Sequence, residues 1–195
     1  MIIEFPYDRE RAVEYARRWA LSRNPLFFDF TGRGGNCTNF VSQCLFAGSG
    51  VMDFTSTFGW YFRSASDRAP AWTSVESLFD FLTDSGDFAG MVKQGPFAVP
   101  VTNDSEVEIG DVIQLADSSG DFYHTLIISD FTPNDVLVCA QSDNALDRPL
   151  STYSYDSLRV LHILGVALEL PLDNSFLPLI EGRGLRSVTA IDTQV

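Results

Sequence analysis

The chain has 195 residues, of which 26 are acidic and 13 are basic, and its net charge is −13. So negative a chain is not expected to bind nucleic acid or an anionic membrane, whereas a neutral or cationic substrate is compatible with it. The length and the hydrophobic share of 45% are those of one globular domain with a real core. We expect that domain to span residues 1–170. The pattern is lost after it, so residues 171–195 are interpreted as a C-terminal extension or tail.

The cysteine and histidine content argues against a disulfide framework and a structural metal. Three cysteines cannot make a closed framework, and Cys37 and Cys44 lie too far apart on one predicted helix to pair. No C-x-x-C pair occurs and there are only two histidines, so we expect no metal and no cofactor. The N-terminus lacks the features of a signal peptide and no segment is long enough to span a bilayer. We therefore expect a cytoplasmic protein without membrane insertion, unless the sequence is a trimmed form of an exported one.

The first half of the chain predicts helices. Asp8 can cap a first helix that runs to about Arg23. Apolar residues at helical spacing predict a second helix from Cys37 to about Gly48. A capping-box pattern at residues 73–76 opens a third helix.

From residue 95 onward the pattern changes from helical to extended. Turn sequences separate four predicted strands, over residues 97–101, 112–115, 122–129 and 136–141. Residues 144–154 are interpreted as a polar loop. A last strand is predicted over residues 158–164, with residues 166–170 extending or following it, and residues 177–180 could pack on the body. Helices first and hairpin-joined strands afterwards indicate an α+β domain with N-terminal helices packed on an antiparallel sheet.

The segment from Gly34 to Cys37 is typical of a tight loop that turns into a helix. Asn36 is a good N-cap residue, so Cys37 lies at or next to the first helical position. There the free backbone amides and the positive end of the helix dipole favour a thiolate over a thiol. Cys37 is therefore a candidate nucleophile, and its backbone N–H is a candidate oxyanion donor. The alternative is that Cys37 is simply a small buried apolar residue.

A thiolate nucleophile needs a partner that carries its proton. His124 lies near the start of a predicted strand, from which it can reach a helix N-terminus packed on the sheet, whereas His162 lies mid-strand and is interpreted as structural. Gln141 and Asp143 share a face at the end of the next strand, and either could accept a hydrogen bond from the imidazole. The aspartate would also stabilise the imidazolium, but side-chain alternation does not choose between the two.

Several aromatic residues could line a substrate groove, although such residues more often belong to the core. Trp60 lies in an aromatic stretch at residues 54–62, and Tyr123 precedes the candidate base. Together with Asn36, which precedes the candidate nucleophile, these two are the predicted substrate-binding residues.

Three motifs together resemble a known family. They are the segment at residues 34–45, the Tyr123-His124-Thr125-Leu126-Ile127 segment and the Arg148-Pro149-Leu150-Ser151 segment. They are similar to the family called "putative amidase domain", in the papain-like NlpC/P60 and CHAP group of cysteine peptidases and amidases. The resemblance covers about residues 6–163. It implies a papain-like fold, with Cys37 as nucleophile and His124 as base in cleaving an amide bond of a cell-wall (peptidoglycan) peptide.

Two features depart from the family's pattern. Asn36 stands where the family usually has aspartate. The family's third polar residue, often histidine, falls on Gln141, and its later aspartate falls on Asn144. A glutamine orients an imidazole less strongly, so the alternative is a weakly active or inactive domain of the same fold that binds a peptide or peptidoglycan. The oligomeric state is left open.

Overall fold

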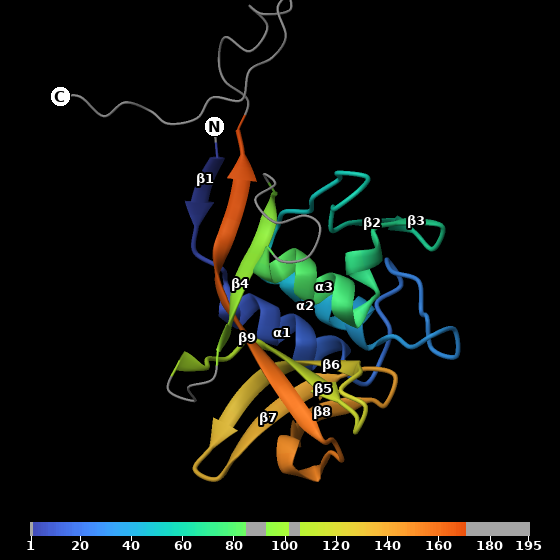
Figure 1. Ribbon diagram of the computed structural model, residues 1–195, viewed down its shortest axis with the longest axis vertical. Coiled ribbons are helices and arrows are strands. Elements are labelled where there is room, and N and C mark those ends of the chain that lie inside the picture. Colours follow the sequence, from blue (N-terminus) through green and yellow to red (C-terminus); the bar gives the residue numbers. More distant parts are fainter. Residues whose placement is uncertain (1, 85–92, 102–105, 171–195) are drawn as a thin grey trace, which may run out of the picture.

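The computed structural model describes residues 2–84, 93–101 and 106–170 (Figure 1). Over these residues the helices are α1 (Arg9–Trp19), α2 (Cys37–Ser49) and α3 (Val75–Thr83), with short 3-10 turns η1 (Pro70–Trp72) and η4 (Leu150–Thr152). The strands are β1 (Ile2–Phe5), β2 (Phe62–Ser64), β3 (Asp67–Arg68), β4 (Gly95–Val101), β5 (Val112–Ala116), β6 (Phe122–Thr132), β7 (Asp135–Ala140), β8 (Ala145–Pro149) and β9 (Ser157–Glu169).

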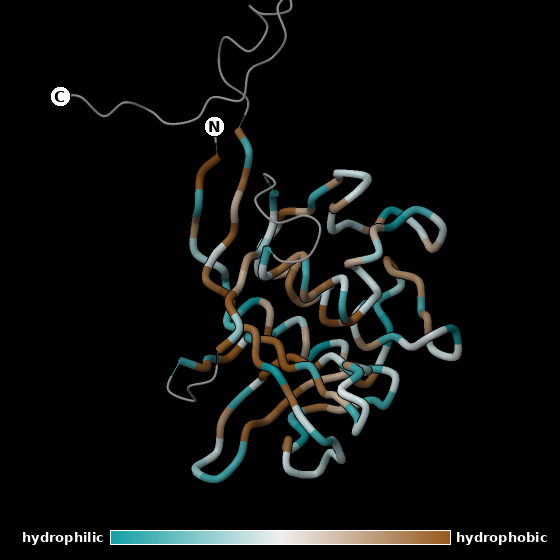
Figure 2. The backbone as a smooth tube through the Cα atoms, viewed as in Figure 1, coloured by the Kyte–Doolittle hydropathy of each residue, from teal (hydrophilic) through white to brown (hydrophobic). Residues whose placement is uncertain are grey.

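One antiparallel sheet of seven strands forms the centre of the fold. Its order is β1-β9-β5-β6-β7-β8, and β4 also pairs with β9. The long strand β9 pairs with β1 at its C-terminal end and with β5 at its N-terminal end, and its pairing with β4 extends from Val160 to Ala167. Strands β5 to β8 follow one another as hairpins. In Figure 2 the chain is hydrophilic at the turn between β6 and β7 and more hydrophobic in the strands that meet there.

The two faces of the sheet carry separate hydrophobic cores. Helices α1, α2 and α3 pack on one face (Figure 1). Val112 and Ile127 belong to the same core as side chains of these helices. Ile113, Leu126 and Ile128 form the core of the opposite face. Successive residues of a strand point to opposite faces, and this alternation explains why neighbours in β5 and β6 belong to different cores.

A buried ionic contact fixes the start of α1 against the sheet. Nη1 of Arg9 lies 2.6 Å from Oδ1 of Asp111, a residue with no exposed surface. Nδ1 of His162 lies 2.8 Å from the other oxygen of Asp111. A buried carboxylate is stable only when it is paired and hydrogen-bonded, which explains the clustering. His162 therefore takes part in the packing between β9 and α1.

The predicted helices and strands are largely confirmed. Asp8 caps α1 by accepting a hydrogen bond from the amide of Arg11 at 2.9 Å, but the helix ends at Trp19, four residues earlier than predicted. Cys37 is the first residue of α2, as predicted, and Gly50 in the left-handed conformation ends that helix. The fold class, α+β with an antiparallel sheet, is also confirmed.

Two local predictions need correction, and two features of the sheet structure were not predicted. The predicted loop at residues 144–154 is wrong, because residues 145–149 pair with β7 as the edge strand β8. Strand β1 was not predicted, since its four residues gain their pairing only from distant β9. The small β2–β3 hairpin was also not predicted. Ser74, rather than Thr73, caps α3.

Two predictions concern residues outside the described ranges. The extension at residues 171–195 and the packing of residues 177–180 both lie there, so the boundary of the domain at residue 170 stays a prediction. Within the described ranges, no helix combines the length and hydrophobicity needed to cross a bilayer.

Candidate functional site

Cys37 occupies the N-terminus of α2, where a helix carries unpaired backbone amides and the positive end of its dipole. Its side chain is mostly covered, with 8% of the residue exposed. The side chain of the preceding residue, Asn36, makes no capping hydrogen bond to the first turn. Asparagine commonly caps a helix with its side chain, but here the side chain of Asn36 leaves the backbone N–H groups of the first turn of α2 uncapped.

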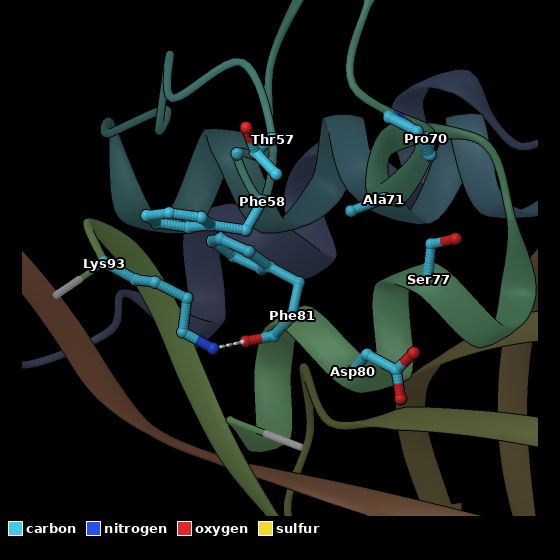
Figure 3. Close-up of a pocket in the computed structure, with 9 residues that line it drawn as sticks. Thr57, Phe58, Pro70, Ala71, Ser77, Asp80, Phe81 and Lys93 are labelled. Carbon is cyan, nitrogen blue, oxygen red and sulfur yellow. Dashed lines mark hydrogen bonds between the residues drawn. The ribbon is translucent and has the colours of Figure 1, made fainter. Parts of the chain in front are cut away.

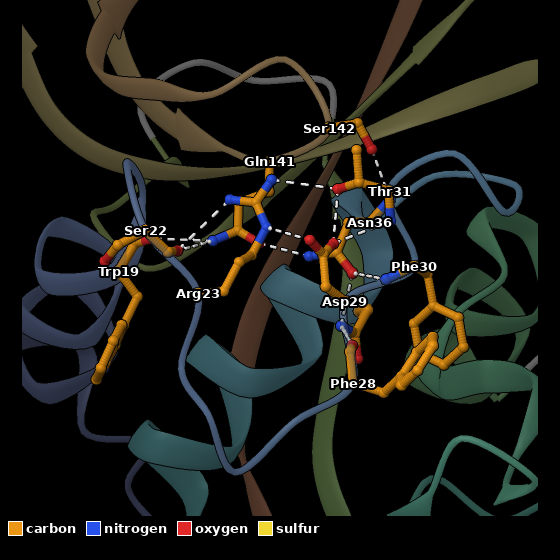
Figure 4. A network of polar contacts seen from close by, with 11 residues as sticks. Trp19, Ser22, Arg23, Phe28, Asp29, Phe30, Thr31, Asn36, Gln141 and Ser142 are labelled. Carbon is orange, nitrogen blue, oxygen red and sulfur yellow. Dashed lines mark hydrogen bonds and ion pairs between the residues drawn. The ribbon is translucent and has the colours of Figure 1, made fainter.

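The side chain of Asn36 is instead held in a buried network (Figure 4). Its Oδ1 accepts hydrogen bonds from the backbone N–H of Phe30 at 2.9 Å and from Nδ2 of Asn39 at 2.8 Å. Its Nδ2 donates to Oε1 of Gln141, and its backbone N–H donates to Oγ of Ser142. With 1% of the residue exposed, Asn36 shapes the loop before Cys37 and presents almost no surface to a substrate.

Gln141 is fully engaged in the same network. Its Nε2 donates to the backbone carbonyl oxygens of Trp19 at 2.7 Å and Ser22 at 2.8 Å, while its Oε1 accepts from Asn36 (Figure 4). The side chain thereby connects the end of α1 to the loop that precedes α2. Both donors and the acceptor of the amide are in use, so Gln141 has no spare donor with which to orient another group.

Thr38 and Thr125 connect the start of α2 to strand β6. The two hydroxyl oxygens lie 2.9 Å apart, and both residues are buried. The Sγ atom of Cys37 lies 3.9 Å from the hydroxyl of Thr38. The residue of β6 that faces α2 is therefore Thr125, the neighbour of the predicted base.

The ring of His124 belongs to the opposite face of β6. His124 pairs with Leu115, whose side chain lies in the core of the opposite face. Because side chains alternate along a strand, His124 points to the same face as Leu126 and Ile128, and Thr125 points to the other. Its ring centroid lies 6.0 Å from that of Tyr153. Among the described residues, no hydrogen bond joins the thiol of Cys37 to this imidazole. The fold brings the two segments together through the contact between Thr38 and Thr125.

Burial controls the protonation of His124. It lowers the pKa of the imidazole to about 4, with Arg148 lowering it further and Asp143 opposing the shift. Asp143 is exposed and forms an ion pair with Arg148 at 3.4 Å. Of the two residues predicted to orient the imidazole, Asp143 is the one whose charge acts on it, and Gln141 belongs to the α1–α2 contact.

The two aromatic candidates lie in different environments. Trp60 has no exposed surface, and its Nε1 donates to Oγ of Ser42 at 3.1 Å. It packs against Trp72 with ring centroids 4.9 Å apart, so it is a core residue with no surface to offer to a substrate. Tyr123 is about half exposed, and its hydroxyl donates to the carbonyl oxygen of Ser154 at 2.9 Å. Only Tyr123 remains accessible.

A pocket lies beside α3 (Figure 3). Its volume is about 220 Å³, and Phe58, Pro70 and Phe81 form apolar walls, with Ser77 and Asp80 on the side of α3. None of the predicted site residues lines it. The signal for it in the sequence was the aromatic stretch at residues 54–62, of which Phe58 reaches the pocket and Trp60 does not.

The described ranges contain no group of three or more histidine, cysteine, aspartate or glutamate side chains arranged to hold a metal ion. The three cysteines in these ranges are all buried and unpaired.

Comparison with known proteins places the chain in a family. The family described as "putative amidase domain" matches residues 6–164, and the chain belongs to it. The chain is also 36% identical over 157 residues to the uncharacterized protein YhbB of Bacillus subtilis (strain 168). That match covers 78% of this chain and 46% of YhbB, so the chain spans about half the length of this curated relative. A search of the solved structures gave no match.

Proposed function

We propose that this domain is a papain-like cysteine amidase or peptidase that hydrolyses an amide bond with Cys37 as its nucleophile. The position of Cys37 at the start of α2 carries the proposal, because the side chain of Asn36 leaves the first turn uncapped. Membership of the putative amidase domain family supports the reaction class. The uncapped amides would stabilise two negative charges in turn, first on the thiolate and then on the oxyanion.

The reaction follows from the chemistry of a thiolate. Cys37 gives up its proton and attacks the carbonyl carbon of the amide, whose oxygen becomes the oxyanion held by the backbone N–H of Cys37. The tetrahedral intermediate collapses when the amine leaves with a proton from the protonated base. Water then attacks the thioester and returns the free thiol and a carboxylic acid.

His124 is the proposed base. Burial lowers the pKa of its imidazole to about 4, so the ring is neutral at pH 7 with a free lone pair, but it is a weak base in this environment. It adjoins Thr125, which contacts the start of α2. The proposal requires the ring to reach the thiol around the start of β6 when the substrate is bound. Asp143 would then stabilise the imidazolium by its charge.

The proposed substrate is a cell-wall peptide of the peptidoglycan type. The resemblance to the NlpC/P60 and CHAP group suggests this class of substrate. The net charge of −13 is compatible with a neutral or cationic peptide.

One observation favours a second function, a module that binds such peptides with little turnover. Alternation places the imidazole of His124 on the face of β6 away from α2, and the amide of Gln141 is fully used elsewhere. A domain without a preformed base would bind substrate and turn it over slowly. Retained binding of peptidoglycan fragments by the Cys37→Ala variant, with no hydrolysis by the wild type, would support this function.

Hydrolysis is tested by incubating the protein with peptidoglycan fragments and a panel of peptide amides, followed by mass spectrometry. We expect the wild type to release new amines and carboxylic acids, and Cys37→Ala to release none. Cys139→Ala is the matched control, because this thiol is also buried and burial raises its pKa. Equal hydrolysis by the wild type and Cys37→Ala would exclude Cys37 as the nucleophile.

The role of His124 is tested in the same assay. We expect His124→Ala to lower kcat by about 100-fold or more, which is the usual contribution of a general acid–base group. His162→Asn is the control for loss of a histidine, and it should lower stability through Asp111 without abolishing hydrolysis. Retention of full kcat by His124→Ala would assign the proton transfer to another group.

A further inference from the structure

The start of α2 carries a line of three side-chain atoms that leads from the nucleophile to the sheet. It runs from Sγ of Cys37 to the hydroxyl of Thr38, at 3.9 Å, and on to the hydroxyl of Thr125, at 2.9 Å. Thr38 and Thr125 are 1% and 0% exposed, so water does not compete for these hydroxyl groups. Hydrogen bonds in such an environment are stronger than at the surface.

We propose that Thr125 is a positioning residue for the thiolate of Cys37, and that it acts through the hydroxyl of Thr38. This inference rests on the proposed function of Cys37 as a nucleophile. Neither threonine touches the reacting carbonyl in this proposal, so neither is a catalytic residue.

The number of hydrogen atoms in this line limits the directions of its hydrogen bonds. Each hydroxyl has one hydrogen to donate. If the hydroxyl of Thr125 donates to Thr38, the hydrogen of Thr38 is free to point at sulfur, which suits a thiolate that can only accept. If the thiol of Cys37 keeps its proton, the same contacts run in the reverse direction, from sulfur to Thr38 and on to Thr125. A neutral thiol is compatible with either direction, whereas a thiolate is compatible only with the first. Ionisation of Cys37 therefore selects the arrangement in which Thr125 donates to Thr38 and Thr38 donates to sulfur, without moving any heavy atom, while the proton leaves for the base.

The sheet explains why Thr125 can hold this position. It pairs with Gln114 in the middle of β5, and the side chain of Gln114 contacts the backbone of α3 on the same face. The pairing of β6 with β5 therefore fixes the threonine hydroxyl toward the helices. A rigid strand is a better support than a loop for a group that orients a nucleophile.

The experiment measures the alkylation rate of Cys37 by iodoacetamide between pH 6 and pH 9, with mass spectrometry of the peptide that contains residue 37. We expect Thr125→Val to slow alkylation at pH 7 by about threefold or more, because a hydrogen bond to a charged group is weakened. The profile should also move to higher pH. Thr125→Ser keeps the hydroxyl and should restore both the rate and the profile.

Ser129→Ala is the matched control. Ser129 is buried on the same face of β6, and its hydroxyl donates to the carbonyl oxygen of Leu137 at 3.2 Å, away from α2. We expect this variant to lose stability but to keep the alkylation profile of the wild type. If Ser129→Ala slows Cys37 as much as Thr125→Val does, the effect is a general loss of packing and the inference is overturned.

Thr38→Val removes the other hydroxyl of the pair. It also replaces Thr125→Val as the test variant if Thr125→Val fails to fold. The double variant should react no more slowly than the slower single variant, because both changes remove one path. Unchanged alkylation in the folded Thr125→Val or Thr38→Val protein would overturn the inference. Alkylation needs no turnover, so the inference can hold even if the wild type hydrolyses no amide, and it can fail while hydrolysis is observed.

Discussion

The side-chain amides of Asn36 and Gln141, near Cys37, have a structural role instead of the predicted role in binding or catalysis. The amides of Asn36 and Gln141 were candidates for contacts with substrate and imidazole, yet both form buried hydrogen bonds that shape the loop before α2. An amide group carries donors and an acceptor that all require partners when buried. The partners of Gln141, which are the backbone carbonyl groups of Trp19 and Ser22 and the side chain of Asn36, are all distant in sequence, so the sequence pattern could not distinguish an orienting glutamine from a structural one.

The titration of His124 gives a prediction at the residue scale. Its pKa of about 4 in the folded protein lies below the ordinary value of 6.5, so between these two values the unfolded chain binds the proton more readily. The free energy of unfolding should therefore fall as the pH drops through this window. Above the window the imidazole is neutral in both the folded and the unfolded chain, so His124 causes no loss of stability there. NMR titration of the imidazole, with urea unfolding at several pH values, would measure both effects.

The Asp143→Asn variant sharpens this test. The carboxylate of Asp143 raises the pKa of His124, so its removal should lower that pKa further. The control is His124→Asn, in which the part of the pH dependence that belongs to the imidazole should disappear. A His124 that titrates near its ordinary pKa would show that the ring is exposed, and would contradict the packing against Tyr153.

Among the elements, α2 is the one whose packing positions Cys37. Gly48, in its last turn, lies against the ring of Tyr7 and the backbone of Asp8. The backbone N–H of Asp8 donates to the carbonyl oxygen of Gly48 at 3.0 Å. The absent side chain of Gly48 thus lets the end of α2 approach the start of α1. The sequence predicted that α2 ends at about Gly48, but the helix ends at Ser49, with Gly50 in the left-handed conformation as its C-cap.

Gly48→Ala should destabilise the protein, although alanine normally favours a helix by about 1 kcal/mol over glycine. An added Cβ would lie 2.4 Å from Cε2 of Tyr7 and 2.7 Å from the carbonyl oxygen of Asp8. Overpacking of this kind costs about 1–3 kcal/mol, so we expect a net loss of stability of about 1 kcal/mol. Thermal unfolding would measure it, with Ala47→Gly as the control for propensity. A higher Tm for Gly48→Ala would show that the two helices are farther apart.

Across the whole molecule, Gln141 joins three parts of the fold. It follows β7, contacts the end of α1 through Trp19 and Ser22, and holds the loop before α2 through Asn36. These parts are distant in sequence, so the hydrogen bonds of Gln141 hold them together next to the start of α2.

Gln141→Met should keep the side-chain size and remove all three hydrogen bonds. We expect the free energy of unfolding to fall by about 2 kcal/mol or more, because buried partners are left unpaired. Urea denaturation would measure the loss. Gln94→Met is the control, since the Oε1 of Gln94 accepts one hydrogen bond from the exposed Glu169, and it should cost less than about 1 kcal/mol. Equal losses in the two variants would contradict the role of Gln141 as a link.

The sequence by itself determined the local structure and the reaction class to consider. Helical spacing and the Gly34–Cys37 segment predicted the start of α2, and turn sequences predicted the strands from β4 to β7. These signals are readable because capping, turn formation and hydrophobic periodicity depend on residues close in sequence.

Only the tertiary structure decided which side chains meet at Cys37. The pairing of β6 with β5 gives Thr125 to the helical face and His124 to the other, and a shift of one residue would exchange them. The edge strand β8, the pairing of β1 with β9 and the use of Gln141 likewise depend on partners far along the chain. Strand register and buried hydrogen bonds between distant segments are set by the packing of the whole domain, which no local pattern records.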